Sequence, residues 1–238
     1  MIIYGLNPVR EALRAHPKRI RYIAVSNADK EKLGRIVAAA KVANVAVRIF
    51  PREQIGRLAG GMVHNGVVAD VTDTDYVDFD EMISSEEPPE RIFILDGVQD
   101  PQNLGALLRV ADVFAIGLVV VPKHESAGLS GVVTKASAGA SEWVPVAQVT
   151  NLARVIEQLQ EAGYWMYGAD AGGEPIGSVD LTGKVGVVLG NEGRGIRRNV
   201  LDHCDKTISI PMKGKVESLN VSAAAAVIAY EIDRQRRG

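Results

Sequence analysis

The apolar positions in the first third of the chain follow two spacings that alternate. Short apolar runs typical of β-strands lie at residues 21–26, 45–50 and 66–71. Between them, apolar residues recur at the three- and four-residue spacing of a helix over residues 29–44 and 52–60. Near the N-terminus, Asn7 is a favourable helix cap, Pro8 suits the first turn, and Pro17 ends the helix that they begin. The pattern predicts a small α/β unit that ends near residue 72.

The alternation resumes at residue 91 and continues to the C-terminus. Strands are predicted where the apolar runs are densest, at residues 91–97, 117–122, 142–146, 164–170, 184–190 and 206–211. Helical spacing is found at residues 103–115, 129–140, 151–163, 196–204 and 218–238. Strands that alternate with helices in this way predict an α/β fold with a mostly parallel sheet covered on both faces.

Charge is distributed unevenly along the chain, although its net charge is only -2. Residues 1–70 contain 12 basic and 5 acidic residues, a net charge of +7, whereas residues 71–90 contain 8 acidic residues and no basic one. We therefore divide the chain into an N-terminal domain at 1–72, an acidic linker at 73–90 and a C-terminal domain at 91–238. The basic first third could bind a polyanion such as RNA, or it could be an ordinary solvated surface.

The composition excludes several classes of protein. Apolar residues make up 47% and charged residues 24%, which is ordinary for a globular protein. No apolar run approaches the roughly 20 residues of a membrane helix, and the N-terminus lacks the layout of a signal peptide. Cys204 is the only cysteine, which excludes an internal disulfide and a cysteine metal cluster. We expect a cytoplasmic protein without a metal site.

Candidate chemistry gathers where three of the predicted strands end. In parallel sheets, ligands bind in the crevice beyond the carboxyl ends of the strands. The first of these segments, residues 95–112, holds Asn103, which could cap the following helix. It also holds Arg109, which could lie at the edge of the buried face or be an ordinary surface arginine.

The second segment, residues 187–196, has glycines at positions 190, 193 and 195 together with Glu192. Glycine permits positive φ and a close approach of the backbone to a ligand. The pattern GxxGxG is neither the dinucleotide-binding fingerprint nor the phosphate-binding loop of nucleoside triphosphatases. It is interpreted either as a ligand-binding turn or as a tight strand-to-helix turn in which Glu192 favours the helix N-terminus.

The third segment, residues 208–226, offers Ser218 and Asn220 as caps for a helix that begins with four alanines at 223–226. These small residues allow another element to pack very close, with or without a ligand. A nucleophilic role for Ser218 is disfavoured, because none of the four histidines lies in the three segments and no Ser-His-Asp arrangement follows.

Together, "DPQNLGALLRVAD", "VVLGNEGRGI" and "ISIPMKGKVESLNVSAAAAVIAYE" resemble, in order and strand context, the three motifs of the SpoU/TrmH (SPOUT) family of RNA ribose 2'-O-methyltransferases. The stretches "IYGLNPVREAL", "VHNGVVADV" and "LARVIEQLQEAGYWMYGADA" extend the resemblance to its two-domain members. It implies a C-terminal SPOUT domain with a deep trefoil knot, an exception among folds, and a small ribosomal-protein-like (L30e-like) N-terminal RNA-binding domain. It further implies the cofactor S-adenosyl-L-methionine, a homodimer with the site near the subunit interface, and methylation of a ribose, that of a guanosine, in 23S rRNA.

The resemblance also implies roles for individual residues at matching positions. The catalytic cluster would be Asn103, Arg109, Glu192, Ser218 and Asn220. The cofactor would be held by Gly168, Leu189, Gly190, Asn191, Gly193, Ile210, Met212 and Leu219. Basic residues of the N-terminal domain would contact RNA phosphates, namely Arg10, Arg14, Arg19, Arg21, Lys41, Arg48 and Arg52.

The chemistry of ribose methylation bears on the role of Arg109. A ribose hydroxyl is a poor nucleophile at neutral pH and needs its proton removed or its developing negative charge stabilised. Because an arginine side chain is effectively never deprotonated in proteins, we interpret Arg109 not as a base but as a cation that holds the adjoining phosphate and stabilises the alkoxide. Asn103 and Glu192 are expected to orient it, and a phosphate oxygen or a water would take the proton.

Three other functions are weighed against 23S rRNA methylation. The first is ribose methylation of tRNA, although family members that act on tRNA usually lack this N-terminal domain. The second is a non-catalytic RNA-binding protein of ribosome assembly, which the intact catalytic cluster disfavours. The third is a nicotinamide-dependent oxidoreductase, which the glycine pattern disfavours because it is late in the chain and has the wrong spacing.

Overall fold

A computed structural model describes the whole chain except residues 30, 217 and 238. It divides into two compact units, which we call unit 1 and unit 2. Unit 1 comprises Met1–Asp75 and Gly128–Trp143, and unit 2 comprises Tyr76–Ala127 and Val144–Gly238. The sequence-based division had assigned the segment 128–143 to the C-terminal domain, whereas its tertiary contacts place it in unit 1.

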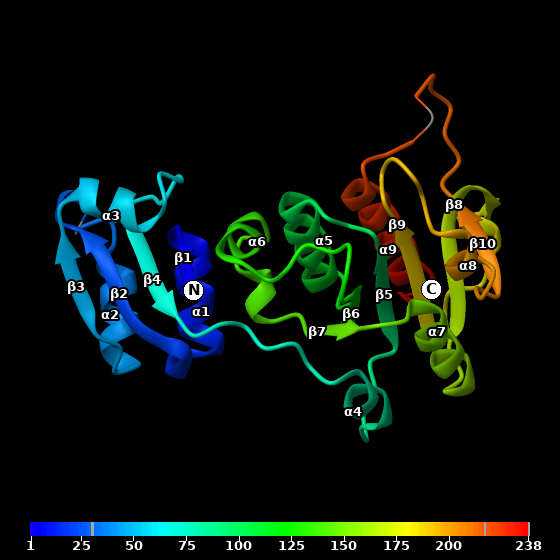
Figure 1. Cartoon of the computed structure of the whole chain (residues 1–238), viewed down its shortest axis with the longest axis horizontal. Coiled ribbons are helices and arrows are strands. Elements are labelled where there is room, and N and C mark those ends of the chain that lie inside the picture. The colour runs from blue at the N-terminus through cyan, green and yellow to red at the C-terminus, as the bar shows by residue number, and fades with distance from the viewer. Residues whose placement is uncertain (30, 217, 238) are drawn as a thin grey trace. The chain divides into compact units, whose positions relative to one another are not determined.

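Unit 1 is built on a four-stranded mixed sheet of order β1-β4-β2-β3 (Figure 1). Its strands are β1 (Ile2–Tyr4), β2 (Ile20–Ser26), β3 (Val47–Phe50) and β4 (Val67–Val71). Only β2 and β3 pair in parallel, and β4 runs antiparallel to both β1 and β2. The helices are α1 (Leu6–Ala15), α2 (Gly34–Val42), α3 (Arg52–Leu58) and α6 (Gly131–Ala136), with 3-10 turns at Pro17–Arg19, Asn27–Asp29 and Ala140–Glu142.

The two faces of this sheet are covered to different extents. On one face, buried residues of β2 such as Ile23 pack against Val9 of α1 and Ile36 of α2. The other face packs against Ile55 of the short helix α3. Since α3 has only seven residues, side chains at the margin of this face such as Tyr22 remain half-buried.

Unit 2 is built on a six-stranded sheet of order β10-β8-β9-β5-β6-β7, in which every neighbouring pair is parallel. The strands are β5 (Arg91–Asp96), β6 (Leu118–Pro122), β7 (Val146–Val149), β8 (Trp165–Pro175), β9 (Val185–Gly190) and β10 (Lys206–Ser209). The helices are α4 (Phe79–Ser84), α5 (Pro101–Val113), α7 (Leu152–Glu161), α8 (Arg198–Leu201) and α9 (Val221–Arg237), with a 3-10 turn at Ile176–Ser178. The parallel α/β sheet predicted from the sequence is confirmed.

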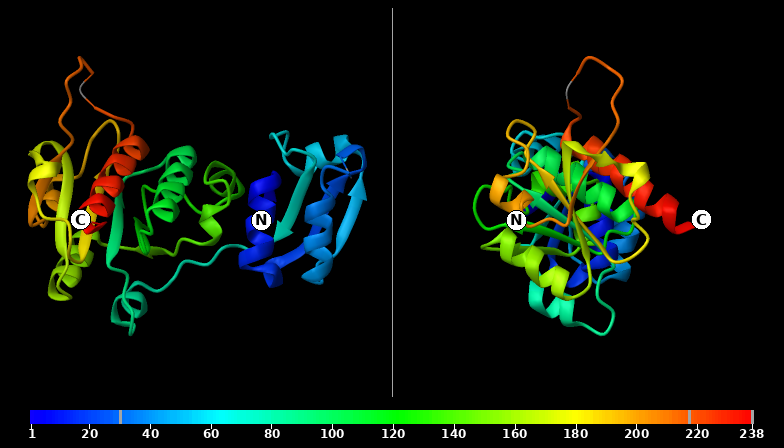
Figure 2. Two further views of the ribbon diagram at one scale, coloured as in Figure 1. Left: turned by 180° about the vertical axis from the view of Figure 1, so that it is seen from behind. Right: turned by 90° about the vertical axis from the view of Figure 1, so that its right-hand side faces the viewer.

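The central strand β5 explains why this sheet is covered on both faces. All of its residues except Arg91 are buried, and alternate side chains point to opposite faces. Ile92 and Ile94 pack in one cluster with Ile156 and Leu159 of α7. On the other face α5 and α9 pack against each other, as Figure 2 shows in green and red.

Two helix starts differ from the sequence prediction. The N-cap of α1 is Gly5 rather than Asn7, which lies inside the helix. The N-cap of α5 is Asp100, whose side chain accepts a hydrogen bond from the backbone N–H of Gln102, 2.9 Å away. Asn103 is therefore not a cap but a first-turn residue, and its side chain is available for contacts with other segments.

Strand ends also differ from the prediction. The strand expected at residues 142–146 is shifted to 146–149, because Glu142 belongs to a 3-10 turn and Trp143 follows it. Strand β1 was not predicted, since three residues are too short for a periodic signal. Helix α4 lies within the stretch 73–90 that was expected to be a linker.

Candidate active site at the carboxyl ends of β5, β8 and β9

The strand order reverses at β5, which has β9 on one side and β6 on the other. Asp96 and Gly190, the last residues of β5 and β9, are register partners, so the loops that follow them leave the sheet side by side. The side chain of Asn191 joins these loops, because its Nδ2 donates a hydrogen bond to the carbonyl of Gly97, 2.8 Å away. Such a reversal is where ligands bind in open α/β sheets.

Two of the three glycines, Gly190 at the end of β9 and Gly195 in the loop after it, are explained by the closure of this loop. Asn191 and Gly195 exchange two backbone hydrogen bonds of 3.1 and 2.8 Å. A Cβ atom at Gly190 would collide with the backbone of Gly195 and Ile196, and Gly195 itself has φ of 68°. The close backbone approach expected at Gly190 is thus an approach of the chain to itself. Gly193 is different, since a Cβ there would meet only Asn191 Oδ1 at 3.5 Å.

A buried carboxylate fixes the far end of the same loop. Asp96 is only 1% exposed, and its two oxygens accept hydrogen bonds from the backbone N–H of Arg197 at 2.8 Å and from Arg197 Nε at 2.7 Å. A buried charge is tolerated when it is paired and hydrogen-bonded in this way. Asp96 is not among the residues selected from the sequence, although an acidic residue at the end of a buried parallel strand is a usable signal.

Three of the predicted catalytic residues form one hydrogen-bonded cluster, which we call the Asn-Glu-Asn cluster: Asn103, Glu192 and Asn220. Nδ2 of Asn103 donates to Oε1 of Glu192 at 2.9 Å, and Nδ2 of Asn220 donates to Oδ1 of Asn103 at 3.0 Å. Nδ2 of Asn220 also donates to Oε1 of Glu192. The first turn of α5, the loop after β9 and the start of α9 therefore meet at one carboxylate.

Arg109 does not join this cluster within the chain. It lies six residues after Asn103, about 9 Å further along α5 and on another side of the helix. Its side chain is exposed and makes no hydrogen bond or ion pair with any residue that the structure describes. The expectation that Asn103 and Glu192 orient Arg109 is therefore wrong for a single chain.

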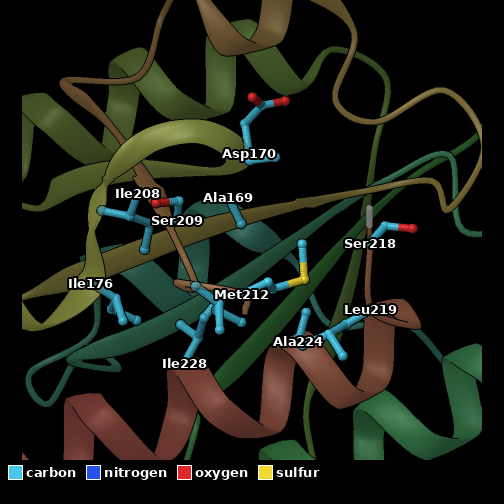
Figure 3. A pocket seen from close by; sticks show the side chains of 12 residues that line it. Ala169, Asp170, Ile176, Ile208, Ser209, Met212, Ser218, Leu219, Ala224 and Ile228 are labelled. Atoms are coloured by element: carbon cyan, nitrogen blue, oxygen red, sulfur yellow. The ribbon is translucent and has the colours of Figure 1, made fainter. Parts of the chain in front are cut away.

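A cavity of about 140 Å³ opens between β8, β10 and α9 (Figure 3), and its wall includes Leu219, the residue directly before Asn220 of the Asn-Glu-Asn cluster. Of the predicted cofactor residues, Ile210, Met212 and Leu219 line it. The predicted catalytic residue Ser218 lines it as well, and it directly precedes Leu219 and Asn220. The other five predicted cofactor residues do not line this cavity within the described part of the chain. They are Gly168, Leu189, Gly190, Asn191 and Gly193.

Gly168 and Leu189 have structural roles inside the sheet. Leu189 is buried in β9, and Gly168 is buried in β8, where a Cβ would collide with the side chain of Leu201 of α8.

The chemistry of the cavity wall is mostly apolar with a few oxygen atoms. Figure 3 shows Ile176, Ile208 and Ile228 together on one side, and all three are buried. Polar groups come from Asp170 in β8 and from Ser209 and Ser218. Apolar walls with a few placed polar groups suit a flat aromatic group with a hydrogen-bonding tail. Sequence analysis missed these residues other than Ser218.

The seven basic residues proposed as RNA contacts all lie in unit 1, but most are already paired. Five of them form ion pairs: Arg10 and Arg14 with Glu11, Arg19 with Glu142, Arg21 with Asp70, and Arg52 with Asp29. Lys41 and Arg48 are exposed and make no ion pair with a described residue. Of the four acidic partners of the paired arginines, only Glu142 lies outside residues 1–70, so these ion pairs leave most of the net charge of +7 in place.

Neither a membrane-spanning helix nor a metal-binding cluster is found among the described residues. None of the helices there combines the length and the apolar character that crossing a membrane requires. No group of three or more His, Cys, Asp and Glu side chains in the same part of the chain could hold a metal ion.

Two family models match the chain. Residues 90–230 match the SpoU rRNA Methylase family, and residues 2–77 match the family described as RNA 2'-O ribose methyltransferase substrate binding. The chain belongs to the SpoU rRNA methylase family. The matched region contains all three segments that meet in the Asn-Glu-Asn cluster.

Similar proteins cover the chain to different extents. The 23S rRNA (guanosine-2'-O-)-methyltransferase RlmB of Coxiella burnetii is 41% identical over 98% of this chain and 95% of its own length. The methyltransferase AviRb of Streptomyces viridochromogenes, solved with AdoMet, has a similar fold, with a TM-score of 0.81 at 24% identity over 100% of this chain and 90% of that one. The TrmH/SpoU tRNA modifying enzyme of A. aeolicus is 25% identical with a TM-score of 0.58, over 66% of this chain and 80% of that one.

Proposed function

We propose that this protein is an S-adenosyl-L-methionine-dependent RNA methyltransferase that methylates the ribose 2'-hydroxyl of a guanosine in 23S rRNA. The observation that carries the proposal is the Asn-Glu-Asn cluster near an apolar cavity, in a chain that is similar over 98% of its length to a 23S rRNA (guanosine-2'-O-)-methyltransferase. The cytoplasm, where rRNA is assembled into ribosomes, is the proposed location.

The cavity suits the proposed cofactor. Ile208, Met212 and Ile228 offer an apolar surface for the adenine ring, and the oxygens of Asp170 and Ser209 can accept hydrogen bonds from ribose hydroxyls or the amino group. When bound, S-adenosyl-L-methionine supplies a methyl group on a positively charged sulfur. The protein's contribution is to position the two reactants and to exclude water from the site.

The Asn-Glu-Asn cluster and Arg109 have complementary roles in this proposal. Glu192 is held by two amide groups, so that its position relative to the cavity is fixed. Arg109 stays protonated and stabilises the negative charge that develops on the ribose oxygen while it holds the adjoining phosphate. The proton leaves to a phosphate oxygen or to water.

We propose further that the protein acts as a homodimer in which Arg109 serves the site of the second copy. The exposed apolar side chains of α9 and the end of α5 support this: Tyr230 is 52% exposed, Val227 and Val113 are also exposed, and the Tyr230 ring meets Phe114 edge-on. The distance of Arg109 from the Asn-Glu-Asn cluster of its own chain supports it as well.

The expected trefoil knot stays a prediction, since strand order alone does not specify how the chain is threaded.

Mixed dimers test the shared site. Arg109→Ala and Asn220→Ala are each expected to be inactive, but a one-to-one mixture of the two, denatured and refolded together, should recover roughly a quarter of wild-type methyl transfer. Half of the dimers are then mixed, and each mixed dimer has one site with an intact cluster and an intact arginine. A mixture as inactive as its parents would show that Arg109 acts within its own chain.

The substrate class is tested with the purified protein and labelled methyl donor. Transfer to 23S rRNA but not to bulk tRNA is expected, and ribose-methylation mapping in cells without the protein should show one lost guanosine site. The tRNA alternative is disfavoured because the tRNA modifying enzyme of A. aeolicus aligns with only 66% of this chain. Stabilisation by S-adenosylhomocysteine but not by NAD would exclude the oxidoreductase alternative.

The role of Arg109 has a test of its own. Arg109→Lys keeps the positive charge but loses the planar guanidinium fork that binds a phosphate through two N–H groups. We expect methyl transfer to fall by about two orders of magnitude or more, with the affinity for S-adenosylhomocysteine unchanged, measured by calorimetry. Near-normal turnover of this variant would contradict the role.

A further inference from the structure

One arginine of unit 1 is stacked on an aromatic ring. The guanidinium carbon of Arg48 lies 4.1 Å from the centre of the Tyr22 ring. Tyr22 is on β2 and Arg48 on the edge strand β3, where Arg48 pairs with Ala24, two residues beyond Tyr22. Tyr22 packs with the cluster beneath α3, so the stack stands at the margin of the sheet face that α3 covers. Tyr22 is half-buried and Arg48 is exposed.

Within the part of the chain that the structure describes, Arg48 has no ion-pair partner, in contrast to most arginines of the unit. Six others form ion pairs with carboxylates: Arg10, Arg14, Arg19, Arg21, Arg52 and Arg57. Arg35 and Arg48 have no such partner among the described residues. The acidic residue opposite Tyr22, Asp70, is paired with Arg21 at 3.1 Å. The ring of Tyr22 thus lies against a guanidinium that is exposed and has no ion-pair partner among the described residues.

We propose that the Tyr22–Arg48 stack is a binding platform for an unpaired base of the RNA substrate. A base can stack on the exposed face of the guanidinium, while the N–H groups at its edge donate to a neighbouring phosphate. The inference rests on the proposed function, and it adds the residues that recognise a single-stranded part of the substrate. An RNA occupant is favoured by the net charge of +7 over residues 1–70.

The alternative is that Arg48 only adds to a non-specific positive surface. Charge acts on any phosphate backbone, whereas stacking requires a base that is free of its own helix. The two roles therefore predict different effects of RNA structure and of the Arg48→Lys substitution. Lysine keeps the positive charge but lacks the planar guanidinium on which a base could stack.

The test measures RNA binding by the full chain with fluorescence anisotropy. The probes are a labelled stem-loop with an unpaired loop and a fully paired duplex with the same number of phosphates. We expect Arg48→Lys and Tyr22→Ala to weaken binding of the stem-loop by roughly tenfold or more and binding of the duplex by less than about threefold. Tyr22→Phe keeps the ring and should bind like wild type.

The matched control is Arg35→Ala, which removes an exposed arginine of α2 that has neither an ion-pair partner nor an aromatic partner among the described residues. It should weaken stem-loop and duplex binding equally and slightly. The proposal is overturned if Arg48→Lys binds the stem-loop like wild type, or if Arg48→Lys affects both probes equally. Arg48 is exposed, so this variant stays informative even if Tyr22→Ala does not fold.

The outcome is separable from that of the proposed function. If the wild-type protein transfers no methyl group to 23S rRNA, the proposed function fails whatever the stack does. If the wild type methylates 23S rRNA and Arg48→Lys has an unchanged KM for it, only the stacking platform is refuted.

Discussion

Asn220 shows how one side chain can do structural and chemical work together. Its Oδ1 accepts hydrogen bonds from the backbone N–H and the hydroxyl of Ser222, which caps the start of α9. Its Nδ2 donates to Asn103 and Glu192. A substitution that keeps the acceptor but removes the donor can therefore separate the two roles.

We predict that Asn220→Ser keeps stability and loses activity. Serine is as good an N-cap as asparagine, so the free energy of unfolding should change by less than about 0.5 kcal/mol. Without Nδ2, Glu192 loses one of its two amide partners, and methyl transfer should fall at least about tenfold. Urea unfolding and a methyl-transfer assay measure the two effects. The control Asn220→Ala should lose activity and should also lower the free energy of unfolding by about 1 kcal/mol, because alanine cannot cap the helix. A fully active Asn220→Ser would show that the amide is dispensable.

At the scale of elements, the turn between β9 and α8 is held by its own backbone. The hydrogen bonds between Asn191 and Gly195 close it, and Asp96 anchors its end through Arg197. This turn carries Glu192, so the position of the Asn-Glu-Asn cluster depends on the closure of the loop.

The two glycines of this turn provide a matched pair of variants. Gly190→Ala places a Cβ against the backbone of Gly195 and Ile196, so the loop must open. We expect lower thermal stability and at least about tenfold weaker methyl transfer. In Gly193→Ala the new Cβ contacts only Asn191 Oδ1 at 3.5 Å, which is an ordinary van der Waals distance. This variant should keep the thermal stability of wild type, and its rate of methyl transfer should stay within about twofold of wild type. Equal damage from both variants would mean that loop closure is not the reason for the glycine at position 190.

The 3-10 turn at Ala140–Glu142 gives unit 1 a pH-dependent element. Burial raises the pKa of Glu142 above its ordinary value of 4.5, although Arg19 and His16 act in the opposite direction. The residue is 5% exposed, and its Oε2 accepts a hydrogen bond from Arg19 Nη1 at 3.1 Å. A carboxyl group whose pKa is raised on folding binds its proton more tightly in the folded state.

The sign of the pH effect follows from this shift. The contribution of Glu142 to the free energy of unfolding is fully present below about pH 4.5 and is lost as the pH rises through the raised pKa. We predict that Glu142→Gln makes the free energy of unfolding depend less on pH as the pH rises above about 4.5. Urea unfolding across this range measures it. An unchanged pH dependence would show that the dependence comes from other groups.

At the scale of the whole molecule, the boundary between the units is not a single cut in the sequence. The segment 128–143 belongs with the first 75 residues, since Gly131 packs against the carbonyl of Ile2 and Glu142 pairs with Arg19. A deletion of residues 1–72 would leave this segment without its packing partners. Surface substitutions are therefore a better test of the role of unit 1 than truncation.

We predict that replacing exposed cations of unit 1 weakens RNA binding without affecting the cofactor. Arg14→Ala combined with Lys41→Ala should lower the affinity for all RNA probes and reduce its dependence on salt, because fewer counterions are released. The affinity for S-adenosylhomocysteine should be unchanged, as its proposed cavity is lined by unit 2 alone. Anisotropy at two salt concentrations and calorimetry check this. An undiminished salt dependence would place the RNA contacts elsewhere.

The parts of the fold that could be predicted are those with a strong local signal. The dense apolar runs of β5, β6 and β9 are buried on both faces and were predicted with nearly correct ends. The shift of β7 could not be predicted, because Glu142 lies in a 3-10 turn where it pairs with Arg19, more than 120 positions earlier in the sequence. Likewise Asn103 is released from capping by Asp100 and instead contacts Asn220, 117 positions away.

The sequence by itself determined the alternation of strands and helices, the parallel sheet, the family and the identities of the catalytic candidates. These follow from side-chain periodicity and from motifs that are continuous in the chain. Only the tertiary structure decided that Asn103, Glu192 and Asn220 meet, that Arg109 lies apart from them, and that residues 128–143 join unit 1. The physical reason is that these contacts depend on which strands become neighbours, and strand order is set by packing of the whole sheet rather than by local preference.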